Sequence, residues 1–135
     1  MHITRTELLR TLQRELGLTV LLITHDLGLV AEMCDQVNVM YAGRIVESAP
    51  VSRLFRLPAH PYTRGLIAAR VHTGSRELPV GISGRVPGLA EMPSGCPFHP
   101  RCSLAGPECA DRDPETERVE DGHSVRCHRW RTGAA

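Results

Sequence analysis

Apolar residues in the first part of the chain follow helical and strand patterns in turn. Thr4 and Glu7 form the signature of a capping box, and the leucines after them are spaced for one buried helical face that ends at Gly17. Residues 18–24, LTVLLIT, form an unbroken apolar run, which predicts a strand buried on both faces. A helix followed by such a strand is half of an α/β unit, so we expect an incomplete parallel sheet whose other strands lie outside this chain.

A second helix and a hairpin are predicted next. Residues 27–34 place apolar side chains at helical spacing directly after Asp26, a residue type that caps helices. Val37, Val39 and Tyr41 lie at alternate positions, and the run that continues past Gly43 predicts a β-hairpin that turns at this glycine. The first part of the chain is therefore expected to be of the α/β class.

The pattern weakens after the hairpin. Pro50 opens a short predicted helix, and another is expected over residues 62–70. Residues 71–84 contain three glycines and no apolar periodicity, which is typical of a linker. We therefore divide the chain into residues 1–70, with the helices and the hairpin, the linker 71–84, and residues 85–135.

Composition separates the two ends of the chain. Most of the 10 Pro and four of the 5 Cys lie in residues 85–135, where aliphatic runs are scarce. We expect the hydrophobic core to form only in residues 1–70, and the last part to be a small irregular Cys-rich domain. A segment that buries little apolar surface needs another cross-link to offset the entropy of ordering its backbone.

Charge and hydropathy exclude two classes of protein. The 16 basic and 15 acidic residues give a net charge of +1, so the chain lacks the basic surface that nucleic-acid binding requires. No apolar run approaches the length of a membrane span, and the N-terminus lacks the pattern of a signal peptide. We expect a cytoplasmic protein with no membrane span of its own, in which cysteines serve as metal ligands rather than as disulfides.

His25 is a candidate for phosphate chemistry because of its position. It directly follows the predicted buried strand, and ligands of open α/β sheets lie outside the carboxyl ends of the strands. An imidazole there can donate a hydrogen bond to a phosphate oxygen or orient a water molecule. From position alone, His25 is as readily a polar residue in a strand-to-helix turn.

Four cysteines form the candidate metal site: Cys96, Cys102, Cys109 and Cys127. They are separated by five, six and seventeen residues, which matches neither the C-x₂-C of common zinc sites nor the cysteine run of bacterial ferredoxins. The spacing shows that four thiolates can converge, and it leaves an iron–sulfur cluster, zinc and no metal open. Cys34, on a predicted helical face, is expected to be a small buried hydrophobic residue.

Two stretches resemble a known family. The text LTVLLITHDLGLVAEMCDQVNVMYAGRIVE is similar to the segment around the switch histidine of ABC transporter ATPases. The text LFRLPAHPYTRGLIAAR, with a His-Pro-Tyr-Thr motif at residues 60–63, resembles the peptide-importer branch of these ATPases. The resemblance implies the C-terminal portion of a P-loop ABC ATPase domain, in which His25 contacts the γ-phosphate of ATP. The motif at 60–63 identifies the family, and we expect no chemistry from it.

The C-terminal text resembles the domain appended to peptide-importer ATPases. The run RVPGLAEMPSGCPFHPRCSLAGPEC, followed by GHSVRCH, matches the four cysteines of that domain one for one. The resemblance implies that Cys96, Cys102, Cys109 and Cys127 hold a [4Fe–4S] cluster, with zinc as the alternative. Arg101 is a candidate to neutralise part of the negative charge of the cluster.

The sequence departs from the family in one large respect. No G-x-x-x-x-G-K-[ST] phosphate loop, signature motif or strand with the catalytic Glu is present, so ATP and Mg²⁺ would bind only to a full-length subunit. We expect a fragment of the ATP-binding component of an oligopeptide or dipeptide importer, inactive by itself and peripheral on the cytoplasmic face of the membrane. Its partners would be two permease subunits, a second ATPase subunit and an extracytoplasmic peptide-binding protein. The alternatives are a free-standing iron–sulfur or zinc module and the non-functional product of a truncated gene.

Overall fold

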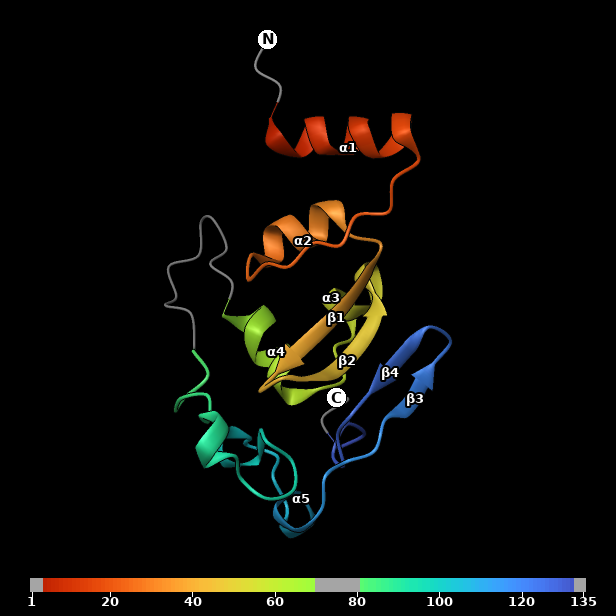
Figure 1. Cartoon of the computed structure of the whole chain (residues 1–135). Coiled ribbons are helices and arrows are strands. Elements are labelled where there is room, and N and C mark those ends of the chain that lie inside the picture. Colours follow the sequence, from red (N-terminus) through yellow and green to blue (C-terminus); the bar gives the residue numbers. More distant parts are fainter. Residues whose placement is uncertain (1–3, 70–80, 133–135) are drawn as a thin grey trace, which may run out of the picture.

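The computed structural model describes residues 4–69 and 81–132, so the predicted linker lies largely outside the described residues. In chain order the elements are α1 Arg5–Leu16, α2 Leu27–Met33, β1 Gln36–Tyr41, β2 Arg44–Pro50, α3 Val51–Arg56, α4 Pro61–Ala68, the 3₁₀ turns η1 Leu89–Glu91 and η2 His99–Arg101, α5 Pro107–Asp111, β3 Glu117–Glu120 and β4 His123–Val125. Figure 1 shows α1 beyond α2, away from the strands, and α5 at the opposite end of the molecule. The α/β character predicted from the sequence is confirmed.

The predicted hairpin is present. Residues of β1 alternate between exposed and buried, and β1 pairs antiparallel with β2. The turn between the strands uses Ala42 with φ 47° and Gly43 with φ 78°. Positive φ at both central residues matches the twist of the flanking strands, which explains why the hairpin turns at this point.

The sheet differs from the prediction in direction. Its four strands are ordered β1-β2-β4-β3 and every pairing is antiparallel, so the expectation of a parallel sheet is wrong for the residues that the structure describes. The two strands of the β3–β4 hairpin come from the segment that we expected to be irregular. The short connections within each hairpin permit only antiparallel pairing, because parallel strands need a long crossover.

The apolar run 18–24 is not a strand in this structure. It has no regular secondary structure, and Leu21 is 85% and Ile23 90% exposed. A strand must hydrogen-bond to a neighbour, and among the described residues the sheet takes its strands from other segments. The prediction of a buried strand is therefore wrong here, because the partners that it assumed are not among the described residues.

The first helix has the predicted ends but not the predicted burial. In α1 the Thr4 hydroxyl accepts from the backbone N–H of Glu7, the Glu7 carboxylate accepts in return from Thr4, and Gly17 closes the helix with φ 63°. Leu8, Leu12 and Leu16 are exposed, in contrast to the buried face that the leucine spacing predicted. Helix spacing shows which face can be buried, and a packing partner is needed to bury it.

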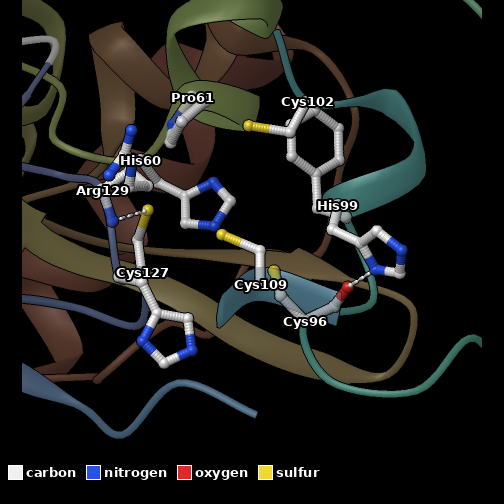
Figure 2. Close-up of a pocket in the computed structure, with 10 residues that line it drawn as sticks. His60, Pro61, Cys96, His99, Cys102, Cys109, Cys127 and Arg129 are labelled. Atoms are coloured by element: carbon white, nitrogen blue, oxygen red, sulfur yellow. Dashed lines mark hydrogen bonds between the residues drawn. The ribbon is translucent and has the colours of Figure 1, made fainter. Parts of the chain in front are cut away.

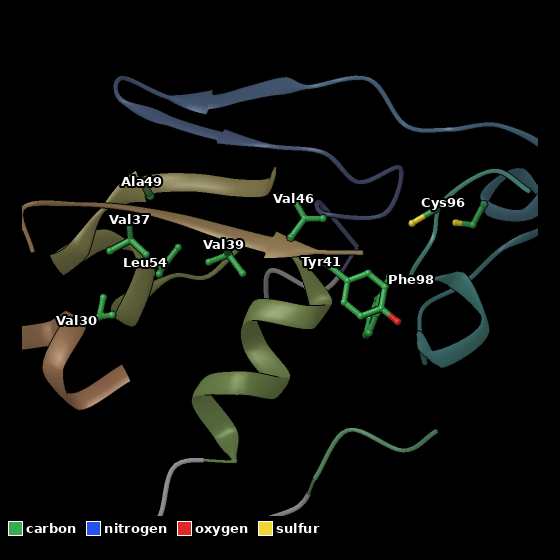
Figure 3. Packing of buried hydrophobic residues seen from close by; sticks show 10 residues of the cluster. Val30, Val37, Val39, Tyr41, Val46, Ala49, Leu54, Cys96 and Phe98 are labelled. Atoms are coloured by element: carbon green, nitrogen blue, oxygen red, sulfur yellow. The ribbon is translucent and has the colours of Figure 1, made fainter. Parts of the chain in front are cut away.

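The hydrophobic core joins both ends of the chain. Val37, Val39 and Tyr41 from β1 pack with Leu54 of α3, and Phe98 from the Cys-rich segment completes the cluster (Figure 3). The ring centroids of Tyr41 and Phe98 are 5.1 Å apart in an edge-to-face arrangement. The expectation that the core forms only in residues 1–70 is wrong, because the aromatic ring of the Cys-rich segment packs onto the hairpin.

No helix within residues 4–69 and 81–132 has both the length and the apolar character that crossing a lipid bilayer would require.

Candidate functional site

One small cavity brings the four predicted cysteines together (Figure 2). It is lined by Cys96, Cys102, Cys109, Cys127, His60, Pro61, Phe98, His99, His128 and Arg129. All five cysteines of the chain are free thiols, and three of the four at the cavity are buried. The convergence that the spacing only allowed is therefore found in the structure.

Backbone geometry brings Cys96 and Cys109 together. The N–H of Cys96 donates to the carbonyl of Cys109 at 2.8 Å, which joins the turn before η2 to helix α5. Gly95 makes this approach possible, since its φ of 66° lies in the left-handed region. A Cβ atom at this position would lie 2.4 Å from the Cys109 carbonyl oxygen.

Replacing Gly95 by Ala is expected to pull these two cysteines apart. The left-handed backbone disfavours a side chain by about 1–2 kcal/mol, and the clash with the Cys109 carbonyl adds to this cost. We expect the free energy of unfolding, measured with urea, to fall by about 2 kcal/mol or more.

Gly88→Ala is the matched control for this prediction. Gly88 has φ −70°, and a Cβ atom added there would meet nothing within 4 Å, so its loss of stability should stay below about 0.5 kcal/mol. Equal losses for the two variants would show that the close approach at Gly95 does not hold the site together.

Backbone amides point at the sulfur atoms. The N–H groups that do so belong to Phe98 and His99 for Cys96, Leu104 and Ala105 for Cys102, and Arg129 for Cys127. The Arg129 N–H lies 3.3 Å from the Cys127 sulfur. N–H donors favour the thiolate over the thiol, so this backbone is arranged to stabilise negative charge on sulfur.

Burial acts in the opposite direction on the same thiols. It raises the pKa of Cys127 to about 12, and it also raises the pKa of Cys96 and of Cys102. Each of these thiols is further disfavoured as a thiolate by the neighbouring cysteines, which reflects their proximity. Cys96, Cys102 and Cys127 therefore need a cation nearby in order to be deprotonated together.

Two nitrogen donors at the cavity have no protein partner. His60 Nε2 and Arg129 Nε are buried and make no hydrogen bond within the described part of the chain. Arg129 lines the cavity and donates to Glu108 through its Nη1 at 3.2 Å, while its Nε has no partner among the described residues. Buried donors without acceptors are rare, and here they border a cavity lined by sulfur. A bound group that accepts hydrogen bonds would supply partners for such donors.

The thiols do not form a preassembled site for a single ion. Within residues 4–69 and 81–132, no three His, Cys, Asp or Glu side chains are grouped closely enough to hold a metal ion. A tetrahedral zinc with bonds of about 2.3 Å to sulfur would need sulfur atoms only about 3.8 Å apart. The four cysteines therefore line one cavity, but within the described residues they are not grouped to hold a single metal ion.

The other predicted site residues lie elsewhere. His25 is exposed at the bend before α2, and Asp26 caps this helix by accepting from Gly28 at 2.8 Å and Leu29 at 3.1 Å. Cys34 is half-buried at the end of α2 and packs against the core, outside the cysteine cavity. The structure therefore does not bring His25 and the four cysteines into one site.

Two polar residues of the cavity were not predicted from the sequence. His60 and Arg129 line the cavity, although neither lies at a recognisable ligand spacing. Arg101, the candidate to neutralise part of the charge of a cluster, donates to the carbonyls of Ser83 at 2.8 Å and Ile82 at 3.1 Å. The His-Pro-Tyr-Thr motif was the available signal for His60, and we interpreted it only as a mark of the family.

Known proteins that are similar to this chain are named as parts of peptide transporters. Residues 46–109 match the family described as the oligopeptide/dipeptide transporter C-terminal region. A protein of Brucella ovis named as a peptide import ATP-binding protein is 47% identical over 136 residues, which cover 96% of this chain and 40% of the relative. A peptide ABC transporter ATP-binding protein of Sinorhizobium fredii is 46% identical over 90% of the chain and 35% of its own length.

A more distant relative shows the same pattern of coverage. An oligopeptide transport ATP-binding protein of Bacillus subtilis is 39% identical over 92% of this chain and 39% of the relative. The chain thus spans about two fifths of the length of the curated relatives that it matches.

Proposed function

We propose that the chain belongs to the family of peptide import ATP-binding proteins, and that it is the C-terminal part of the ATP-binding subunit of an importer for oligopeptides or dipeptides. The identity of 47% over 96% of the chain carries this proposal. In the complete transporter the subunit would lie on the cytoplasmic face of the membrane. Its partners there would be two permease subunits, a second ATPase subunit and an extracytoplasmic peptide-binding protein.

The proposal divides the chain as the sequence suggested. Residues 1–70 form the end of the nucleotide-binding domain, residues 71–84 the linker, and residues 85–135 the transporter-specific C-terminal domain. The pairing of β2 with β4 supports a fixed arrangement of these two parts, because Glu47 lies opposite Val125 in one sheet.

Within this function, His25 is the residue that contacts the γ-phosphate. Its exposure at the start of α2 supports the role, since the ring is free to meet a nucleotide bound to other parts of a complete subunit. The cap at Asp26 fixes the backbone next to the ring. An imidazole N–H donated to a phosphate oxygen stabilises charge in phosphoryl transfer.

The cysteine cavity is the second part of the proposal. We infer that Cys96, Cys102, Cys109 and Cys127 hold a [4Fe–4S] cluster, which supplies a redox-active anionic cross-link when bound. Support comes from the burial of the thiols, the backbone N–H groups aimed at sulfur, and the two unpartnered donors. Four cysteines are a known ligand set for a [4Fe–4S] cluster and for zinc, and the resemblance of this segment to the peptide-importer domain favours the cluster.

ATP turnover tests the transport proposal. The 135-residue chain should show none, because phosphoryl transfer requires a phosphate-loop Lys, Mg²⁺ ligands and loop amides that its sequence does not contain. Joined in frame to a segment with these motifs and assembled with permease subunits in vesicles, it should hydrolyse ATP in response to peptide. There, His25→Ala should lower turnover by about 10²-fold or more, the effect of losing one transition-state donor.

Glu115→Ala serves as the control in the same vesicles. This glutamate is exposed, in a segment without regular structure and outside the cysteine cavity, so its loss should leave ATP turnover within about twofold of the parent. Turnover by the isolated chain that disappears in His25→Ala would contradict the proposal, as would full turnover by the assembled His25→Ala subunit.

A further inference from the structure

His60 presents a hydrogen-bond donor to the cysteine cavity. The ring is 1% exposed and lines the cavity together with all four cysteines. Figure 2 shows it lying among the labelled cysteines, with its ring directed into the space that they border. Its Nε2 atom has no hydrogen-bond partner among the described residues. Such a buried polar atom calls for a partner that the protein part of the structure does not supply.

The protonation of the ring follows from its other nitrogen. His60 Nδ1 accepts from the backbone N–H of Tyr62 at 3.0 Å, as the N-terminal cap of α4. A nitrogen that accepts a hydrogen bond carries no proton, so the neutral ring has its proton on Nε2. The unpartnered atom is therefore an N–H group that faces the sulfurs.

The same geometry argues against His60 as a metal ligand. A metal on Nε2 would require the neutral ring to carry its proton on Nδ1. That proton would then oppose the N–H of Tyr62, and the cap of α4 would be lost. The ring is thus arranged to donate from Nε2.

Two further contacts fix the direction of the ring. The Glu47 carboxylate accepts from the backbone N–H of His60 at 2.9 Å, which holds the residue at the start of α4. The Phe98 ring lies 5.7 Å from the imidazole, between centroids, and limits its rotation. Because these contacts and the hydrogen bond from Tyr62 already restrict the ring, it loses little conformational entropy when Nε2 meets an acceptor.

We propose that His60 Nε2 donates a hydrogen bond to a sulfur of the cluster held by the four cysteines, and so raises the reduction potential of that cluster. This inference rests on the proposed [4Fe–4S] centre. It assigns the histidine of the His-Pro-Tyr-Thr motif the role of a hydrogen-bond donor to that centre. Hydrogen bonds to sulfur are one of the factors that set cluster potentials, because they favour the more negative, reduced state.

His60→Asn in the full chain tests the inference. Asparagine is a good N-cap, so it can replace the acceptor for Tyr62 while its short side chain lacks the Nε2 donor. We expect unchanged helix content and unchanged iron per chain. The equilibrium constant for reduction should fall about tenfold, which corresponds to about 59 mV for one electron. The potential is measured by titration of the cluster absorption under anaerobic conditions.

His128→Asn is the matched control. This ring lines the same cavity, but its Nε2 already pairs with the Arg112 carbonyl at 2.8 Å, so the potential should not move. An unchanged potential in His60→Asn would overturn the role of His60 and leave the cluster standing. Loss of iron from a folded His60→Asn chain would make His60 a ligand and overturn the donor role. Wild-type chain without iron would overturn both the cluster and the inference.

Discussion

Cys109→Ser is expected to abolish iron binding. Anaerobically prepared wild-type chain should contain about four irons and four sulfides and absorb broadly at about 400 nm. Cys109 is 5% exposed on α5, and its carbonyl joins this helix to Cys96. A serine hydroxyl is a far weaker ligand than a thiolate, so the iron content should fall from about four to below about one per chain, with loss of the band.

Denaturation separates ligation from folding in this experiment. Because metal binding contributes folding free energy, the wild-type chain should lose stability when its iron is removed. The free energy of unfolding of Cys109→Ser should equal that of the iron-free wild type, and it should not rise when iron and sulfide are added. Cys34→Ser, a change outside the cavity, should keep both colour and iron.

Two results would count against the cluster. A Cys109→Ser chain that retains its full iron content would show that the four sulfurs at the cavity are not the ligands. Stoichiometric zinc without iron in the wild-type chain would favour the single-ion alternative.

Local patterns in the sequence predicted local elements well. The capping box at Thr4, the cap at Asp26 and the turn at Gly43 each depend on residues within a few positions of one another, and each is present. Such features follow from short-range hydrogen bonding and from backbone geometry. The sequence therefore indicated where most helices of the first part begin and where the hairpin turns.

Long-range features were less accessible. The join between the two hairpins depends on β4, a strand of three residues, two of which pair with β2 across most of the chain. A strand this short has no readable periodicity. The apolar run 18–24 was misjudged for a different reason. Its composition predicts a buried strand, but a strand forms only where neighbouring strands can pair with it, and these are not among the described residues.

The sequence predicted the four candidate ligands of the site but not the side chains that surround them. Cysteine content and family resemblance pointed to the four thiols, which the structure brings to one cavity. His60 precedes Cys96 by 36 positions and reaches the cavity only because α4 packs beside it. Donors of this kind are set by tertiary contacts, so spacing in the sequence does not reveal them.

Glu47 is a buried carboxylate at the junction of three segments. It is 1% exposed on β2 and accepts from the backbone of Ala59 at 2.7 Å and of His60 at 2.9 Å. His123 Nε2 on β4 lies 2.8 Å from the same carboxylate. Its neighbour Val46 is also buried, so both faces of β2 are covered at this point, which simple alternation would not predict.

Removing this carboxylate leaves three buried groups without their acceptor. Loss of one member of a buried, hydrogen-bonded charged set costs about 3–5 kcal/mol, because the remaining groups stay desolvated. The segments affected are β2, the start of α4 and β4, which come from both sides of the predicted linker. The His60 ring would also lose its backbone anchor at the cysteine cavity.

Glu47→Ala is accordingly expected to lower the free energy of unfolding by about 3–5 kcal/mol, measured by urea denaturation of the full chain. Glu47→Gln keeps one acceptor oxygen and should lose less, about 1–3 kcal/mol. Glu115→Ala, at an exposed position without regular structure, is the control and should change stability by no more than about 0.5 kcal/mol. A loss below about 1 kcal/mol for Glu47→Ala would mean that water or another group satisfies the three donors, and that the junction does not depend on this carboxylate.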